Sequence, residues 1–192
     1  ADKAENGKSV WLKAANVATA PTNAELPSDA HVIGAVQRHF GSNATMVCAA
    51  GGLPGELHKL WQQGAPGSYH VEYGFSCMGY EIAGGLGVKL AKPEEEVIVM
   101  VGDGSYMMMN SEIATSIMMG AKINIIVLDN RGYGCINRLQ MATGGANFNN
   151  LLKDTHHVTL PGIDFAAHAA AMGAVSRKVS SIPHRRLDPT AS

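Results

Sequence analysis

The 192-residue sequence is poor in charge, in cysteine and in long apolar runs, and each shortage excludes a class of protein. Charged residues make up 16% and the net charge is −1, so the composition gives no electrostatic footprint for nucleic acid. The three cysteines, Cys48, Cys77 and Cys135, are odd in number and far apart, which gives no disulfide framework and favours a reducing, cytoplasmic setting. No apolar run is long enough for a membrane helix, and no signal peptide opens the chain.

What the chain does have is a high apolar content, because hydrophobic residues make up 46%, which is typical of a heavily buried α/β domain. The first residue is not methionine, so we expect a piece of a longer or processed protein. Residues 1–28 are polar and are predicted to form a linker or N-terminal arm. Residues 29–180 are predicted to form the domain, and residues 181–192, which carry no periodicity, an irregular tail.

Strand-like and helix-like segments alternate along the predicted domain, which indicates an α/β fold with a parallel sheet and helices on both faces. Residues 131–152, rich in Gly and Asn, are predicted to form a long functional loop with little regular structure. The methionines of a helix predicted at 105–119 are expected to lie in the core. The predicted strands cover residues 45–49, 69–73, 97–101 and 123–128, and the other helices residues 29–40, 79–90 and 164–172, with a short helix that follows a loop at 51–55 and ends at Trp61.

A polar residue follows each of the two most apolar predicted strands, both of which are expected to be buried. Asp103 comes just past the first of these strands, and Asn130 lies just past the second. Because parallel α/β sheets bind ligands beyond the carboxyl ends of their strands, we expect both side chains to face one crevice. Gly102 and Gly104 would leave the backbone bare, so that phosphate oxygens could approach the amide N–H groups of the following helix.

The oxygen atoms at these strand ends predict a metal site. The carboxylate of Asp103, the amide oxygen of Asn130 and a backbone carbonyl from the next loop, most simply that of Gly132, are hard ligands that suit Mg²⁺ or Ca²⁺ better than zinc. Taken alone, Gly-Asp-Gly and Asp-Asn-Arg-Gly are each good turn sequences, and a pair of turns is the structural alternative. Because each follows a predicted strand, the two together favour a metal that offsets the charge of a bound diphosphate.

The Gly-Asp-Gly segment at 102–104, followed by the Asp-Asn pair at 129–130, resembles the thiamine diphosphate motif of the acetolactate synthase and pyruvate decarboxylase superfamily. The resemblance extends over residues 26–172 and implies the C-terminal diphosphate-binding domain, with thiamine diphosphate and Mg²⁺ as cofactors. The first Asn of that family's pair is Asp129 here, whereas the second Asn, the family's metal ligand, is present as Asn130. The metal ligands implied by the resemblance are Asp103, Asn130 and Gly132.

Two further segments resemble cofactor-binding parts of the same superfamily. Residues 73–80 resemble the segment beside the pyrimidine ring, which implies that the carbonyl of Ser76 accepts from the 4′-amino group and that Met78 donates its N–H to the ring and props the cofactor in a bent conformation. Core packing is the alternative role for Met78, since the chain has ten methionines. The cofactor-binding residues implied in this way are Gly52, Leu53, Ser76, Met78, Gly102, Asp103, Gly104, Ser105, Asn130 and Gly132.

The segments "AAGGLPGELHKLW" and "DNRGYGCINRLQ" resemble those superfamily members that open a cyclic 1,2-diketone by adding water across a C–C bond. The alternatives are an acetolactate synthase-like carboligase or decarboxylase and a non-catalytic diphosphate- or nucleotide-binding module. The third lacks support, because the chain has neither GxGxxG after its first predicted strand nor GxxxxGK[ST]. The resemblance also implies a homo-oligomer as the full-length protein.

The resemblance places the glutamate that activates the cofactor in a separate N-terminal domain, and Glu72, Glu81 and Glu112 lie in the wrong segments for that role. No catalytic residue is therefore assigned, and the isolated chain is expected to bind the cofactors poorly and to be inactive. Several other polar side chains could transfer protons or contact a polyhydroxylated substrate, with solvated or structural roles as the alternative. They are His58, His70, His156 and His157 for proton transfer, and Arg131, Asn137, Arg138 and Gln140 for substrate contact.

Overall fold

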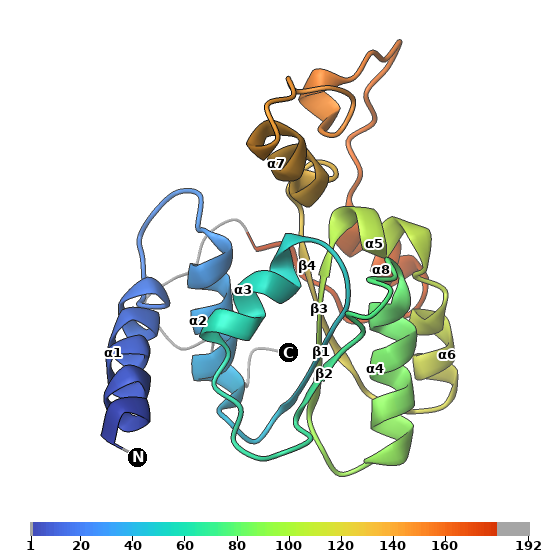
Figure 1. Cartoon of the computed structure of the whole chain (residues 1–192). Coiled ribbons are helices and arrows are strands. Elements are labelled where there is room, and N and C mark those ends of the chain that lie inside the picture. Colours follow the sequence, from blue (N-terminus) through green and yellow to red (C-terminus); the bar gives the residue numbers. More distant parts are fainter. Residues whose placement is uncertain (1, 180–192) are drawn as a thin grey trace. The chain divides into compact units, whose positions relative to one another are not determined.

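The computed structural model describes residues 2–179, and Figure 1 shows its helices and strands. The predicted tail at 181–192 lies outside the described residues. The chain forms two compact units, the first including residues 2–42 and 56–62, the second Asn43–Gly55 and Gln63–Lys178. No helix among the described residues is both long and apolar enough to cross a membrane.

The second unit is built on a four-stranded sheet in the order β2-β1-β3-β4, in which every pair of neighbours is parallel. This confirms the α/β class and the parallel sheet. Both faces of the central strand β3 are covered, because consecutive residues from Val97 to Val101 are all buried although their side chains alternate between faces. The strands are β1 (Thr45–Cys48), β2 (Tyr69–Val71), β3 (Val97–Gly102) and β4 (Asn124–Leu128).

One face of the sheet carries the main hydrophobic core of the second unit. Val97, Val99 and Val101 of β3 pack there with Ile82, and Tyr106 closes the same cluster. Gly85 lets the helix above approach closely, because a Cβ at this position would overlap the side chain of Val99. The helices of this unit are α4 (Tyr80–Ala91), α5 (Asp103–Met108), α6 (Glu112–Met118), α7 (Gly134–Ala142) and α8 (Phe165–Ala171), with a 3₁₀ turn, η1, at Leu152–Asp154.

The edge strand β4 differs from its prediction, because its residues are half-buried and not fully buried. The cause is its position, since β4 has a described strand neighbour on one side only. The predicted long loop after β4 was also wrong in part, because residues 134–142 form α7. Its apolar and helix-favouring residues, such as Ile136, Leu139 and Met141, lie between glycine-rich flanks that suggested a loop.

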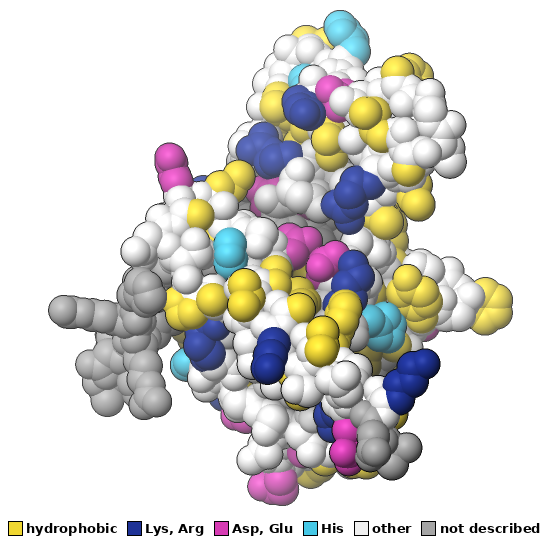
Figure 2. Space-filling model, turned by 60° about the vertical axis from the view of Figure 1, so that its left-hand side comes forward, with side chains coloured by type: hydrophobic (Ala, Val, Ile, Leu, Met, Phe, Trp, Pro, Cys, Tyr) yellow, Lys and Arg dark blue, Asp and Glu magenta, His cyan; other side chains and the backbone are white. Residues whose placement is uncertain are grey.

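The single helix predicted at 105–119 is two helices, α5 and α6, and this prediction was wrong. The side-chain amide of Asn110 donates to the carbonyl of Tyr106 over 3.0 Å, and such side-chain bonds compete with the helical ladder. Its methionines are not core: Met107, Met108 and Met109 are each about half exposed, and Met118 is 78% exposed. Figure 2, which draws one face of the molecule, shows hydrophobic side chains at the surface among scattered Lys and Arg side chains.

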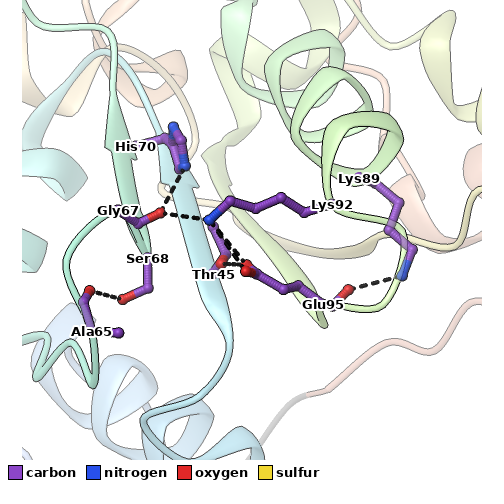
Figure 3. A network of polar contacts seen from close by, with 8 residues as sticks. All are labelled: Thr45, Ala65, Gly67, Ser68, His70, Lys89, Lys92 and Glu95. Carbon is purple, nitrogen blue, oxygen red and sulfur yellow. Dashed lines mark hydrogen bonds and ion pairs between the residues drawn. The ribbon is translucent and has the colours of Figure 1, made fainter.

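The amino end of the sheet is closed by a network of polar contacts, drawn in Figure 3. Lys89 Nζ donates to the carbonyls of Pro93 and Glu95, at 2.6 and 2.8 Å. Lys92 Nζ donates to the carbonyl of Gly67 at 3.1 Å and pairs with the carboxylate of Glu95. The hydroxyl of Thr45 donates to the same carboxylate. Each acceptor in this network therefore has a donor.

The first unit contains α1 (Asp2–Ala18), α2 (Asp29–Phe40) and the later part of α3 (Gly52–Leu60). The α1 helix lies within the residues assigned to an arm or linker, and α3 begins inside the predicted 51–55 loop. The start of α2 is as predicted, because the Ser28 hydroxyl caps it by accepting from the backbone N–H of His31 at 3.4 Å. The indole N–H of Trp11 also donates to the carbonyl of Lys59 within this unit, at 2.9 Å.

Candidate functional site

The parallel pairing of β3 and β4 brings the two predicted metal ligands together. Gly102 is in register with Leu128, so the residues that follow both strands leave the sheet side by side. The backbone N–H of Gly132 donates to Oδ2 of Asp103 at 2.9 Å, which ties the loop after β4 to the start of α5. The structure therefore places Asp103, Asn130 and Gly132 in one cluster at the carboxyl edge.

The side-chain amide of Asn130 meets only acceptors in this cluster. The amide atom that faces Asp103 lies 3.2 Å from Oδ1 of Asp103 and 2.6 Å from the carbonyl oxygen of Gly132. If this atom is nitrogen, the amide donates to both oxygens. If it is oxygen, three oxygens converge without a donor, which is an arrangement that a hard cation satisfies. The donor set therefore fits Mg²⁺.

Asp103 is held as a buried carboxylate, with its side chain only 8% exposed. Burial raises the pKa of Asp103, and the nearby charge of Asp129 raises it further, while N–H donors led by Gly132 act in the opposite direction. Asp129 itself accepts from the backbone N–H of Arg131 at 3.0 Å, an Asx-type turn that helps to hold Arg131 in a left-handed conformation. Two carboxylates that act on each other in this way concentrate negative charge at the carboxyl edge.

The two glycines of the Gly-Asp-Gly segment differ in their surroundings. A Cβ at Gly102 would meet nothing within 4 Å, so this backbone is bare, as expected. At Gly104 it would lie 2.8 Å from Cε1 of Tyr133 and 3.3 Å from Cε of Met78, so this glycine is covered. The structure thus brings Met78 to the predicted cofactor site. Tyr133 was missed, and its only signal in the sequence is an aromatic residue directly after Gly132.

The segment before α4 holds Ser76 in a strained turn with a φ of 53°. Glu72 organises this turn, because its carboxylate accepts from the backbone N–H groups of Phe75 at 3.0 Å and Cys77 at 2.6 Å. These backbone donors, that of Cys77 foremost, lower the pKa of Glu72. The carbonyl of Ser76 therefore has a fixed local frame.

Glu81 links two predicted cofactor loops, although the sequence analysis gave it no role. Its carboxylate is 1% exposed and accepts from the backbone N–H of Ala50 at 3.4 Å and of Gly79 at 2.9 Å. Ala50 precedes the loop with Gly52, and Gly79 follows Met78. The buried carboxylate therefore holds the end of β1 and the start of α4 in fixed relation.

At the end of β1, Leu53 is buried and Gly52 lies under the guanidinium of Arg138, which a Cβ at Gly52 would overlap. Ser105 is buried in the first turn of α5. A cavity of about 400 Å³ opens beside Asn130, and its lining includes two cations as well as leucines. The lining residues are Asn130, Arg131, Leu151, Leu152, Lys153 and Leu160.

The histidines considered as proton carriers do not gather at this site. His70 bonds to the carbonyl of Gly67 at the amino end of the sheet, and His157 bonds to Thr155 in its own segment. Gln140 donates to the carbonyl of Ala146, so its amide also serves its own segment. Among residues 2–179, no group of three or more His, Cys, Asp or Glu side chains could hold a metal ion.

Curated relatives extend well beyond this chain. A 3D-(3,5/4)-trihydroxycyclohexane-1,2-dione hydrolase of Bacillus thuringiensis (strain Al Hakam) is 48% identical over 157 residues, which are 79% of this chain and 24% of the relative. A 3D-(3,5/4)-trihydroxycyclohexane-1,2-dione hydrolase 1 of Bacillus cereus is 47% identical over 161 residues, covering 81% and 25%. The chain thus spans about a quarter of the length of the curated relatives it matches.

A solved structure has the same fold. The thiamine diphosphate-dependent 4-hydroxybenzoylformate decarboxylase of Rhodococcus jostii RHA1 matches with a TM-score of 0.68 over 80% of this chain and 28% of its own, at 21% identity. Residues 49–190 match the family model for the thiamine pyrophosphate enzyme, C-terminal TPP binding domain. By this match, which extends over most of its length, the chain belongs to the family of C-terminal thiamine pyrophosphate-binding domains.

Proposed function

We propose that this chain is the diphosphate- and metal-binding part of a thiamine diphosphate-dependent hydrolase that opens the ring of trihydroxycyclohexane-1,2-dione. Addition of water across one C–C bond would give 5-deoxyglucuronate, a step of myo-inositol breakdown. The observation that carries the proposal is the convergence of oxygens from Asp103, Asn130 and Gly132 at two neighbouring strand ends. The choice of substrate rests on the names and the identity of the Bacillus relatives.

The residues of the cluster would hold Mg²⁺ through one carboxylate oxygen, one amide oxygen and one backbone carbonyl. The bare backbone at Gly102 would leave room for a diphosphate oxygen to complete the shell. The charge of Asp129 adds to the attraction for a cation, and it needs no direct contact to do so. These features make Mg²⁺ and the diphosphate mutually dependent ligands.

The organic part of the cofactor would lie against the segment before α4. The carbonyl of Ser76 would accept from the pyrimidine 4′-amino group, and Met78 would donate its N–H and support the bent cofactor with its side chain. Tyr133 shares the contact with Gly104 and would narrow the same space. When bound, thiamine diphosphate supplies the electron sink for C–C cleavage, while Gly52 and Leu53 would bound it on the side of β1.

The activating glutamate would come from an N-terminal pyrimidine-binding domain in a homo-oligomeric, cytoplasmic enzyme. We further propose that residues 29–180 are the domain, 1–28 its arm and 181–192 its tail. Alone, the chain should bind the cofactors weakly and should not turn over the dione.

The experiment uses a hybrid enzyme, in which this chain replaces the matching quarter of the Bacillus thuringiensis relative. With thiamine diphosphate and Mg²⁺, the hybrid should consume the dione, and the variant Asp103→Ala should not. Condensation of pyruvate without dione hydrolysis would identify a carboligase instead. Binding of ADP or NAD in preference to thiamine diphosphate would identify a non-catalytic module, and either result would reject the proposal.

A further inference from the structure

The helix α7 lies beside the metal-site residues, although the sequence predicted a loop there. A Cβ at Gly134, its first residue, would lie 3.0 Å from the amide nitrogen of Asn130. Residues three and four positions further along a helix share a face with its first residue. Asn137 and Arg138 occupy these positions, so α7 carries them on the face that begins at Asn130.

Arg138 reaches from α7 to the loop after β1, where its guanidinium lies on the backbone of Gly52. Because β3 lies between β1 and β4 in the sheet, the side chain passes across the end of β3, from which Asp103 follows. Within the described part of the chain, the guanidinium makes no hydrogen bond or ion pair. Its donors are therefore available to a ligand above the Gly-Asp-Gly segment.

Asn137 presents the opposite kind of group. Its side-chain oxygen is buried and has no hydrogen-bond partner among residues 2–179. A buried acceptor without a donor destabilises the protein, so a ligand that supplies a donor gains affinity there. Adjacent residues of α7 thus offer unused donors and an unused acceptor.

The chemistry of these two groups distinguishes between ligands. A diphosphate could accept from Arg138, but it has no proton to offer Asn137. A hydroxyl group both accepts and donates, so neighbouring hydroxyls on a ring can use both side chains. Polyhydroxylated rings therefore fit this pair better than anions do.

We propose that Asn137 and Arg138 bind ring hydroxyls of the substrate and set the preference for a polyhydroxylated ring. The proposal rests on the proposed function, because it names the part of the dione that this site recognises. The guanidinium donates to hydroxyl oxygens, and the oxygen of Asn137 accepts from a hydroxyl. Both are specificity-determining residues, since neither is assigned to bond breaking.

The test measures specificity in the hybrid enzyme at neutral pH, with trihydroxycyclohexane-1,2-dione and the unsubstituted ring cyclohexane-1,2-dione as substrates. Arg138→Gln and Asn137→Leu should each lower kcat/KM for the trihydroxy substrate by about 10- to 100-fold, because each removes a hydrogen bond to the substrate. The kcat/KM for the unsubstituted ring and the affinity for thiamine diphosphate should stay within about 2-fold. Lys122→Gln, which removes a positive charge from the exposed pair with Glu96, should leave both substrates unaffected.

Equal losses for both substrates, or loss of cofactor affinity alone, would overturn the inference while the proposed function stands. A parent hybrid without dione hydrolysis would instead reject the proposed function. A second measurement does not need activity: saturation-transfer NMR of the 192-residue chain with myo-inositol as the probe. The transfer should fall at least about 5-fold in both variants, and an unchanged signal would also overturn the inference.

Discussion

At the amino end of the sheet, Lys89 and Lys92 donate to carbonyls and to the carboxylate of Glu95, whereas at the carboxyl end Asp103 and Asn130 face further oxygens (Figure 3 shows the amino end). Both ends are built from loops that join the same parallel strands. The amino end has a donor for each acceptor in its network, and the carboxyl end has an excess of acceptors. The amino end is therefore complete as it folds, while the carboxyl end needs a ligand.

The difference shows how one fold separates stability from binding. A balanced set of donors and acceptors contributes to folding and has no affinity left over. An excess of buried acceptors destabilises the fold until a cation or donor arrives, and binding then restores that free energy. Four changes can break or sharpen this contrast.

The largest effect is expected for Asp103→Asn. The new amide can donate to the oxygens of Asn130 and Gly132, while its own oxygen keeps the bond from the N–H of Gly132. Affinity of the hybrid enzyme for Mn²⁺, read by electron paramagnetic resonance, should fall at least about 100-fold, because the charged ligand is lost. The metal-free 192-residue chain should become more stable by about 1 kcal/mol in urea unfolding.

Asp129→Asn is the matched control for this prediction, since Asp129 contributes charge but lies in a turn. Its affinity for Mn²⁺ should change by no more than about 5-fold, as expected for a partly screened charge. Tight Mn²⁺ binding by Asp103→Asn would show that these oxygens are not the ligands.

Gly132→Ala should be the most damaging change to stability. Gly132 has a φ of 138°, and a Cβ there would lie 2.5 Å from the carbonyl oxygen of Asn150 and 2.9 Å from Cα of Leu151. The strain should lower the free energy of unfolding by about 1–3 kcal/mol. Gly87→Ala, in open space on α4, should instead raise it by about 0.5–1 kcal/mol, and similar values for the two variants would contradict the strain.

A smaller effect is expected at the amino end. Lys92→Met removes the donors to Gly67 and Glu95 and should lower the free energy of unfolding by about 0.5–1 kcal/mol, because the pair is partly exposed and screened. Mn²⁺ affinity of the same variant in the hybrid enzyme should not change. If the metal affinity fell, the two ends would be coupled and the contrast between them would fail.

The smallest effect concerns pH. The hydroxyl of Thr45, and then Lys92, hold the pKa of Glu95 below its ordinary value of 4.5. A depressed pKa contributes stability that is present above 4.5 and is lost as the pH falls towards the folded-state value. The urea midpoint should therefore fall between about pH 5 and pH 3, and Glu95→Gln should show a shallower fall. An equal slope in the variant would place the effect in other carboxylates.

Much of the fold could be predicted because its signals are local. The apolar run of β3 and the Ser28 cap of α2 each depend on a few consecutive residues, and both were predicted correctly. The break between α5 and α6 was missed because Asn110 can either sit in a helix or interrupt one. The exposure of Met107 and Met118 was missed because composition cannot say which face of a helix is covered.

The sequence by itself determined the parallel α/β fold and the pair of strand ends that carry Asp103 and Asn130, because alternating apolar segments and turn residues are read within a few positions. Only the tertiary structure decided that Glu81 is buried between two loops, that Tyr133 covers Gly104 and that Arg138 reaches Gly52. These contacts join segments that are far apart in the chain. Their partners are chosen by packing, which no local pattern records.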